Sequence, residues 1–242
     1  MASAKCVGIL GGMGPLATAD FFQKLVVNTR ASCDEEHIPV FIRSDPTIPS
    51  RREAILNGGS SPVPALLQGL ESLQAQGAEV VAMPCNTAHY FYPQLEPYAR
   101  VPFLHMPRET VAQLKRAGVE QACLLATTMT LRAEVYNSLF QEAGINMVLP
   151  SPQAQEQLME NVFLGVKQGR HDVESSLLEQ EMDRMLHGMG VQIFVLACTE
   201  LPMLFVQKGF SVPVLDTSVV LARAAIRAAG RQTVPIPGGV YS

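Results

Sequence analysis

The stretch Ala-Glu-Val-Val-Ala-Met-Pro-Cys-Asn-Thr-Ala-His occupies residues 78–89 and decides the fold. Its apolar run, 80–83, lies between Gly77 and Pro84 and predicts a short buried strand. Cys85 follows at the point where this strand ends. Because open parallel sheets place their chemistry just beyond the carboxyl ends of their strands, the thiol of Cys85 is a candidate nucleophile or proton-transfer group.

The same pattern returns in the second half of the chain. Residues 190–200, Gly-Val-Gln-Ile-Phe-Val-Leu-Ala-Cys-Thr-Glu, repeat the pattern of residues 77–87, and Cys198 lies 113 positions after Cys85. Two further pairs of segments repeat at offsets of 111 and 115 positions: 101–105 with 212–216, and 6–11 with 121–126. Nearly constant offsets indicate a duplicated half. If the two halves face each other, Cys85 and Cys198 converge on one cleft.

The duplication predicts an α/β fold. We expect two pseudo-symmetric, duplicated domains, each with an open, mostly parallel α/β sheet, and the active site in the cleft between them. The first domain is expected to comprise residues 1–106 plus 215–242 and to carry Cys85. The second is expected to comprise residues 107–214 and to carry Cys198.

Periodicity and prolines predict the local structure between these landmarks. Single helices are expected over 88–99 and 131–143. Two prolines keep the segment 44–52 out of regular structure, which predicts a loop that ends in arginines. A guanidinium there can clamp a carboxylate through two parallel hydrogen bonds, although on the sequence alone Arg51 is an ordinary surface charge.

The composition restricts the class of protein. Of the 242 residues, 48% are hydrophobic and 17% charged, as in an ordinary globular enzyme, and the net charge of −4 gives no reason to expect a nucleic-acid partner. No apolar run approaches the roughly 18 residues of a membrane span, and the N-terminus does not resemble a secretory signal. Five cysteines without close pairing fit a reducing compartment, so we expect a cytoplasmic protein without a membrane partner. The spacing of His and Cys residues predicts no metal site.

A glycine loop follows the first expected strand. Residues 12–17, Gly-Met-Gly-Pro-Leu-Ala, formally match the GxGxxG/A pattern of dinucleotide folds, with Asp34 and Glu35 about 20 residues further on. The match is weakened by Pro15 inside the pattern and by the additional Gly11 before it. In a second interpretation, the loop amides and the helix N-terminus hold a substrate carboxylate. A plain turn between strand and helix is the third interpretation.

Two equivalent thiols narrow the possible chemistry. Cys85 and Cys198 each end an apolar strand and precede a helix start, where a helix N-terminus favours the thiolate. Disulfide redox chemistry usually uses closer spacing, and cysteine hydrolysis needs one thiol with a base. Thiols on opposite faces of a substrate suit inversion of a carbon centre, because one thiolate removes a proton from Cα while the other thiol delivers one. This scheme needs no cofactor, and His89, near the next helix start, either tunes the thiol or serves packing and capping.

At these residues the sequence resembles the cofactor-independent aspartate/glutamate racemase superfamily, most closely its aspartate racemase branch. The resemblance covers almost the whole chain and rests on four motifs: Gly8-Ile-Leu-Gly-Gly-Met-Gly-Pro-Leu-Ala-Thr18, Pro46-Thr-Ile-Pro-Ser-Arg51, Cys85-Asn-Thr-Ala-His89 and Cys198-Thr-Glu-Leu-Pro202. It implies two pseudo-symmetric domains with the substrate between them, Cys85 and Cys198 as the two bases, and a homodimer. The implied reaction interconverts L- and D-aspartate, with glutamate or other amino acids as further substrates.

The resemblance also implies a set of substrate-binding residues. The set comprises Asn86, Thr87 and Thr199 for the backbone groups of the amino acid, Thr127 in the second-half loop, Met13 in the glycine loop, and Arg51, Lys167 and Glu200. Arg51 and Lys167 match the basic pair that holds substrate carboxylates in aspartate racemases, although Lys167 alone suggests only a complement to a helix dipole. Glu200 stands where glutamate racemases usually carry a histidine, which favours the aspartate-like branch.

Three departures from the family pattern concern side-chain specificity. The usual aspartate before the arginine is Ser50, a histidine often present in the last helix is Leu221, and the second loop is Thr-Thr-Met-Thr over 127–130. Other interpretations also stay open, the third from the GxGxxA pattern and the fourth from a cleft between two lobes. They are racemisation of another acid or a hydantoin, isomerisation of a dicarboxylate, a nicotinamide-dependent oxidoreductase, and a small-molecule sensor.

Overall fold

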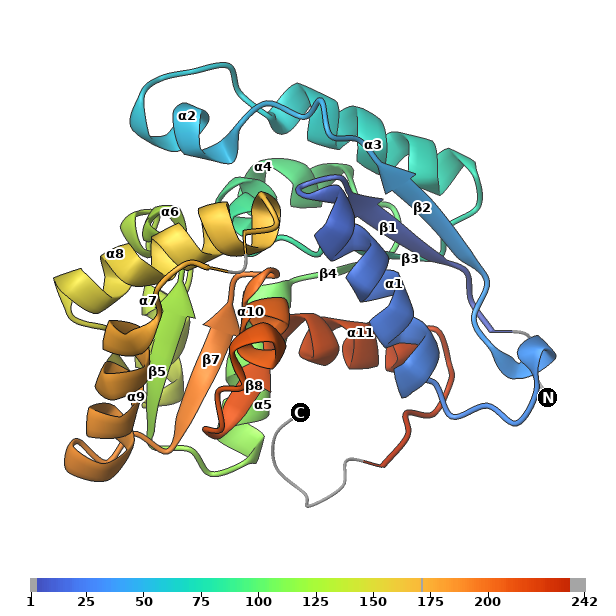
Figure 1. Ribbon diagram of the computed structural model, residues 1–242. Coiled ribbons are helices and arrows are strands. Elements are labelled where there is room, and N and C mark those ends of the chain that lie inside the picture. The colour runs from blue at the N-terminus through green and yellow to red at the C-terminus, as the bar shows by residue number, and fades with distance from the viewer. Residues whose placement is uncertain (1–3, 171, 236–242) are drawn as a thin grey trace. The chain divides into compact units, whose positions relative to one another are not determined.

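The computed structural model describes residues 4–170 and 172–235, which form two compact units (Figure 1). The first unit holds 4–109 and 218–235, and the second holds the rest. Each unit contains one four-stranded sheet in which every strand pair is parallel, with helices packed around it, so the predicted α/β class with two duplicated sheets is confirmed. The predicted domains also include 1–3, 171 and 236–242, which lie outside the described residues, and their boundaries stay a prediction.

The first sheet has the strand order β2-β1-β3-β4. Its strands are β1 (Val7–Gly11), β2 (Val40–Ser44), β3 (Val80–Ala82) and β4 (Phe103–Leu104). In β1, Val7 pairs with Val40 on one side and with Val80 on the other. After β1 the chain forms β2 on one side of β1 and then β3 on its other side. The carboxyl ends of β1 and β3 therefore form the switch point, where such sheets place their ligands. The loops after these two strands carry the glycine motif and Cys85.

Helices cover both faces of the first sheet, so its central strands are apolar on both sides. On one face, Leu10 packs among side chains of α3 (Val63–Ala75). On the other face, Ile9 packs among side chains of α1 (Pro15–Asn28) and α11 (Thr217–Ala228). Burial of both faces fixes the position of β1 and therefore of the loop that follows it.

The second sheet repeats this arrangement with the order β6-β5-β7-β8. Its strands are β5 (Gln121–Ala126), β6 (Asn146–Val148), β7 (Ile193–Ala197) and β8 (Val214–Asp216). Cys123 and Phe194 belong to an apolar core on one face, which is completed by α8 (Pro152–Glu160), η4 (Asn161–Lys167), α9 (Ser176–Gly188) and α10 (Leu201–Lys208). Its switch point lies at the carboxyl ends of β5 and β7, which are followed by Thr127 and Cys198.

Two helices carry the chain from one unit to the other. α5 (Met106–Arg116) begins in the first unit and ends in the second, and α11 follows β8 and leads back to the first. Within the described ranges no helix, these two included, is long and apolar enough to cross a membrane.

The prediction of a single helix over 88–99 is wrong. This segment consists of three short pieces: η2 (Thr87–Phe91), α4 (Tyr92–Leu95) and η3 (Glu96–Tyr98). Pro93 and Pro97 lie in the first turns of the second and third pieces. A proline has no N–H to continue a preceding helix and is tolerated in a first turn, so each proline ends one piece and begins another.

The helix predicted over 131–143 is divided as well. The chain forms α6 (Thr128–Arg132) and α7 (Asn137–Ala143). Between them Glu134 has a φ of 52°, in the left-handed region that a continuous helix cannot contain. The apolar periodicity runs through this break, and this explains why it predicted one helix.

The irregular loop predicted over 44–52 ends earlier than expected. α2 (Arg51–Leu56) begins within it, and the Ser50 hydroxyl caps this helix by accepting a hydrogen bond from the Glu53 N–H at 3.3 Å. Ser50 and Glu53 form the Ser-x-x-Glu pattern of a capping box, which is a signal for a helix start that the proline argument overlooked.

The glycines after β1 are required by packing within the chain. Gly12 has a φ of 95°, and a Cβ on it would overlap the backbone of Asp45. A Cβ on Gly11 would overlap the side chain of Thr18. The acidic residues of the supposed dinucleotide pattern lie in η1 (Asp34–Glu36), which precedes β2 and therefore lies at the amino ends of the strands. These observations explain the glycine pattern without a dinucleotide.

Candidate functional site

Cys85 follows β3 after Met83 and Pro84, and the residue is 7% exposed. Hydrogen bonds hold its backbone on both sides. The N–H donates to the carbonyl of Met83 at 2.8 Å, and the carbonyl accepts from Nδ1 of His89 at 2.9 Å. The backbone from which the thiol projects is therefore fixed within the first unit.

His89 is a buried imidazole with a defined tautomer. Its Nε2 accepts a hydrogen bond from the backbone N–H of Met106 at 3.0 Å, so its proton is on Nδ1. Burial lowers the pKa of His89 to about 4, which leaves the ring uncharged at neutral pH. Because both ring nitrogens bond to backbone groups, the structure favours the packing and capping interpretation of this residue.

The buried imidazole predicts a loss of stability in acid. Below pH 6.5 the unfolded chain binds a proton at His89, whereas the folded chain does so only near the lowered pKa of about 4. The free energy of unfolding is therefore highest above pH 6.5 and falls as the pH is lowered. At pH 4 the loss that His89 causes is about 3 kcal/mol. Urea unfolding at pH 7 and pH 4 measures it, with His89→Asn as the control that removes the titrating group. An equal loss in that variant would contradict the assignment.

The thiol of Cys198 has a carboxylate partner. Cys198 directly follows β7, is 6% exposed, and donates its Sγ–H to Oε2 of Glu200 at 3.1 Å. Burial raises the pKa of Cys198 well above its ordinary value, and the negative charge of Glu200 adds to the effect. Desolvation and this carboxylate therefore oppose the thiolate that the sequence predicts for Cys198 before the helix at Leu201. A thiol that keeps its proton suits a proton donor.

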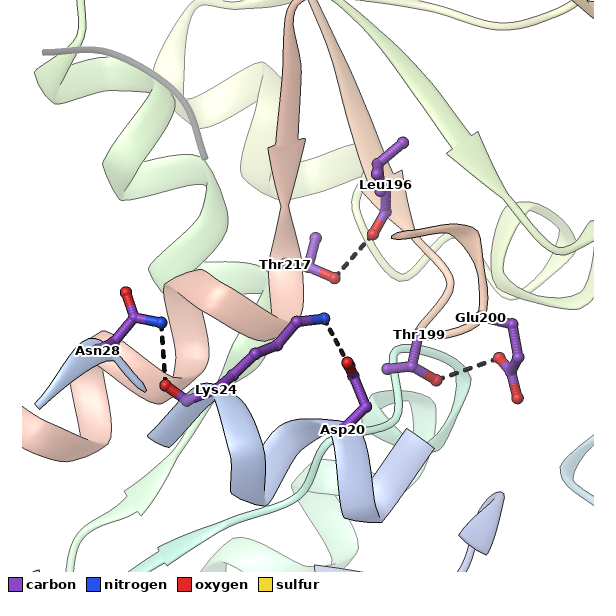
Figure 2. Close-up of polar contacts among 7 residues, drawn as sticks. All are labelled: Asp20, Lys24, Asn28, Leu196, Thr199, Glu200 and Thr217. Atoms are coloured by element: carbon purple, nitrogen blue, oxygen red, sulfur yellow. Dashed lines mark hydrogen bonds and ion pairs between the residues drawn. The ribbon is translucent and has the colours of Figure 1, made fainter. Parts of the chain in front are cut away.

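Glu200 connects three of the predicted site residues. Besides Cys198, its Oε2 accepts a hydrogen bond from the Thr199 hydroxyl at 3.1 Å (Figure 2), and its Oε1 lies 2.8 Å from Nζ of Lys167. The side chain of Glu200 is 7% exposed and that of Lys167 is 38% exposed, so the ion pair links a buried carboxylate to the surface. Because an ammonium group has three N–H donors, the contact with Glu200 is compatible with a further carboxylate on Lys167.

Arg51 is anchored to the loop after β2. As the first residue of α2, it donates from Nη1 to the carbonyl oxygens of Ile48 at 3.1 Å and Pro49 at 3.0 Å. A guanidinium has five N–H donors in a planar fork, so this anchoring orients the group and remains compatible with a bound carboxylate. Ser50, the departure from the family pattern, serves as the cap of α2.

The remaining predicted residues lie shortly after the carboxyl ends of strands, in a loop or at the start of a helix. In the first unit, Met13 follows β1, and Asn86 and Thr87 follow β3 and its cysteine. In the second unit, Thr127 follows β5 and caps α6 by accepting from the Thr130 N–H at 3.3 Å. These residues lie at the switch point of their own sheet, whereas Arg51 follows the edge strand β2 and Lys167 lies in η4.

Two further observations define the class of protein. Leu221, which replaces a family histidine, is fully buried in an apolar core and takes no part in a polar site. In the part of the chain that the structure describes, no three His, Cys, Asp or Glu side chains gather so that they could hold a metal ion. The fold and the site define a duplicated α/β protein with a buried thiol beyond one strand of each switch point.

Comparison with known proteins identifies this class. The sequence matches the Asp/Glu/hydantoin racemase family over residues 10–225. It is 26% identical over 224 residues to the broad specificity amino-acid racemase RacX of Bacillus subtilis (strain 168), covering 91% of this chain and 96% of that protein. The aspartate racemase of Picrophilus torridus is 33% identical with a TM-score of 0.81, and the match covers 95% of this chain and 96% of that chain.

A more distant structure shares the fold alone. The glutamate racemase of Francisella tularensis subsp. tularensis SCHU S4, in complex with D-glutamate, is 15% identical with a TM-score of 0.60, over 98% of this chain and 86% of that one. With the family match, these comparisons confirm the resemblance inferred from the motifs. The chain belongs to the Asp/Glu/hydantoin racemase family, and it is an amino-acid racemase, an enzyme of the isomerase class.

Proposed function

We propose that the protein interconverts L- and D-aspartate without a cofactor, with Cys85 and Cys198 as acid–base groups on opposite sides of Cα. The observation that carries the proposal is the equivalent placement of the two thiols. Each is buried and follows the strand that occupies the same place in the order of its sheet, β3 in the first and β7 in the second. The similarity to an aspartate racemase across nearly the whole chain favours aspartate as the substrate.

In the proposed reaction, a thiolate on Cys85 takes the α-proton from one enantiomer, and the thiol of Cys198 gives its proton to the opposite face of Cα. One C–H bond breaks and another forms, so the product has the inverted configuration, and the enzyme holds a thiol at Cys85 and a thiolate at Cys198. The reverse reaction exchanges the two roles. The raised pKa of Cys198 supports this starting state, because it keeps the donor protonated.

The carbanion that forms at Cα needs hydrogen-bond donors around its carboxylate. We assign this role to polar groups in the loops of both switch points, namely Asn86, Thr87, Thr127 and Thr199, with Met13 lining the pocket. Arg51 and Lys167 bind the side-chain carboxylate of aspartate in this proposal. Glu200 holds Lys167 and the thiol of Cys198 in place, which its contacts at 2.8 and 3.1 Å support.

Arg51→Ala is expected to lower kcat/KM for aspartate by about tenfold to hundredfold, the usual range for a lost charge-assisted hydrogen bond. The activity on alanine, which has no side-chain carboxylate, should change less than about threefold, since it loses no such bond. Arg52→Ala is the matched control, because Arg52 is the next residue of α2 and is exposed. Equal losses for aspartate and alanine would show that Arg51 does not bind the side-chain carboxylate.

Hydrogen exchange tests the reaction itself. The purified protein is incubated in D2O with L-Asp, D-Asp, L-Glu or D-Glu and no added cofactor, while proton NMR follows the α-proton and chiral chromatography follows the enantiomer ratio. Exchange together with racemisation of aspartate is expected. Exchange without inversion would indicate a single working base. Absence of both with all four amino acids would overturn the proposal and favour another acid, a hydantoin or a dicarboxylate.

The family resemblance also supports proposals about the protein as a whole. We propose a homodimer in the cytoplasm that acts on a small amino acid and has neither a nucleic-acid nor a membrane partner. We also propose that its two domains meet at the substrate and comprise 1–106 plus 215–242, and 107–214. Sedimentation velocity of the purified chain tests the dimer, and a purely monomeric species at micromolar concentration would contradict it.

A further inference from the structure

We infer that His89 is a positioning residue for Cys85: its imidazole ties the Cys85 carbonyl to the first residue of α5 and thereby sets the direction of the thiol. The inference rests on the proposed function, in which Cys85 exchanges a proton with Cα. His89 itself touches only the backbone of Cys85 in this role and acts on the substrate through that residue.

The Cys85 backbone is held by two hydrogen bonds beyond the end of β3. β3 has ended at Ala82, so Cys85 lies beyond the regular pairing of the sheet. The hydrogen bond from the Cys85 N–H to Met83 spans only two residues and is local. The bond from His89 connects the Cys85 carbonyl to a second element, because the same ring accepts from the Met106 N–H.

The His89 ring is enclosed by two other rings. His105 meets it edge-on with 4.9 Å between the ring centroids, and Tyr92 stacks against it at 5.8 Å. Both neighbours are held in turn, since the Tyr92 hydroxyl donates to the carbonyl of Phe103 at 2.6 Å and His105 Nδ1 accepts from the Arg108 N–H at 3.2 Å. A ring enclosed in this way transmits the position of α5 to Cys85.

The other unit contains a related connection, which ends within β7. Thr217 is the first residue of α11 and lies 111 positions after Met106, the offset that also relates 101–105 to 212–216. Its hydroxyl donates to the carbonyl of Leu196 at 2.9 Å, two residues before Cys198 (Figure 2). Each cysteine segment is therefore hydrogen-bonded to the first residue of the helix that leads to the other unit. The first unit achieves this through the side chain of His89.

Two variants of similar size separate the two bonds of the ring. His89→Asn retains an N–H donor for the carbonyl of Cys85, four residues earlier. Asparagines elsewhere in the chain make such a bond: Asn28 donates to the carbonyl of Lys24 (Figure 2) and Asn161 to that of Gln157, both at 2.9 Å. His89→Leu has nearly the same shape as the asparagine variant but no donor. Both variants lack the ring atom Nε2 that accepts from Met106, and they differ in the donor for the Cys85 carbonyl.

The expected result is a difference in kcat. His89→Leu should lower kcat for aspartate by at least about tenfold with KM within about twofold, because a small displacement of a reacting group costs rate rather than binding. His89→Asn should stay within about threefold of the wild type in both constants, since it restores the bond. Equal losses of kcat in both variants, or an unchanged kcat in His89→Leu, would overturn the inference.

A second readout does not depend on catalysis. Alkylation of Cys85 by iodoacetamide, followed by peptide mass spectrometry, should accelerate at least about tenfold in His89→Leu and remain unchanged in His89→Asn, with the exposed Cys33 as the internal reference. If the wild type does not racemise aspartate, the proposed function fails while this measurement still decides the inference. If His89→Leu does not fold, His89→Gln and His89→Met replace the first pair of variants. A glutamine can also donate to the carbonyl four residues earlier, as Gln76 does to Ser72 at 3.1 Å. Equal alkylation rates within either pair would overturn the inference.

Discussion

Cys85→Ser and Cys198→Ser are each expected to lower the racemisation of aspartate at least about 100-fold, the usual contribution of one acid–base group. A serine hydroxyl holds its proton far more tightly than a thiol, so it neither removes the α-proton nor returns one readily. At Cys198 the hydroxyl can still donate to Glu200, as the thiol does at 3.1 Å, so the fold should tolerate the change. Initial rates from L- and from D-aspartate, measured by chiral chromatography, give the result.

Isotope exchange in the same variants identifies which thiol serves which enantiomer. With one thiol removed, the other can still exchange the α-proton of the enantiomer that it faces, so deuterium should enter one enantiomer without inversion. Cys33→Ser is the control, because Cys33 is exposed and lies outside both switch points. Racemisation at the wild-type rate in either active-site variant would refute the two-base proposal, whatever the control shows.

The fold could be predicted from the sequence because its signals are local. The apolar runs before Cys85 and Cys198 each follow a glycine, and their repetition predicted two similar parallel sheets before any contact was known. The errors concern interruptions of helices. Pro93 and Pro97 carried a usable signal for the broken segment after Cys85, whereas the break at Glu134 depends on a left-handed backbone conformation that its residue type does not indicate.

The site was predictable in its residues and much less in its electrostatics. Motifs and resemblance placed the thiols in loops beyond strands, as the structure shows for each unit. They did not predict that Cys198 keeps its proton, because its pKa depends on burial and on the orientation of Glu200. Nor did they predict the ion pair between Glu200 and Lys167, since nothing local in the sequence relates residues that lie in η4 and before α10. Contacts between distant segments decide both features.

Gly12→Ala is expected to destabilise the protein by about 3 to 5 kcal/mol, through backbone strain and overpacking together. Gly12 has a φ of 95°, and a Cβ there would overlap backbone atoms of Asp45, which cannot move aside as a flexible side chain could. The loop is also tied to Thr18, whose hydroxyl accepts from the Gly12 N–H and donates to the Gly14 carbonyl, both at 2.9 Å. Urea unfolding of the purified variants at pH 7 measures the effect.

Gly58→Ala is the matched control for this prediction. Gly58 also has a positive φ, of 62°, but a Cβ on it meets no atom within 4 Å, so only the strain of about 1 kcal/mol is expected. The comparison separates a dinucleotide-binding role of Gly12 from a packing role. If the glycine at position 12 were needed only for close approach of a dinucleotide and not for packing, alanine would weaken NAD binding and leave the free energy of unfolding near that of the control. If Gly12→Ala loses several kcal/mol more of the free energy of unfolding than Gly58→Ala, the glycine serves packing between the loops after β1 and β2. This packing holds Met13 at the switch point.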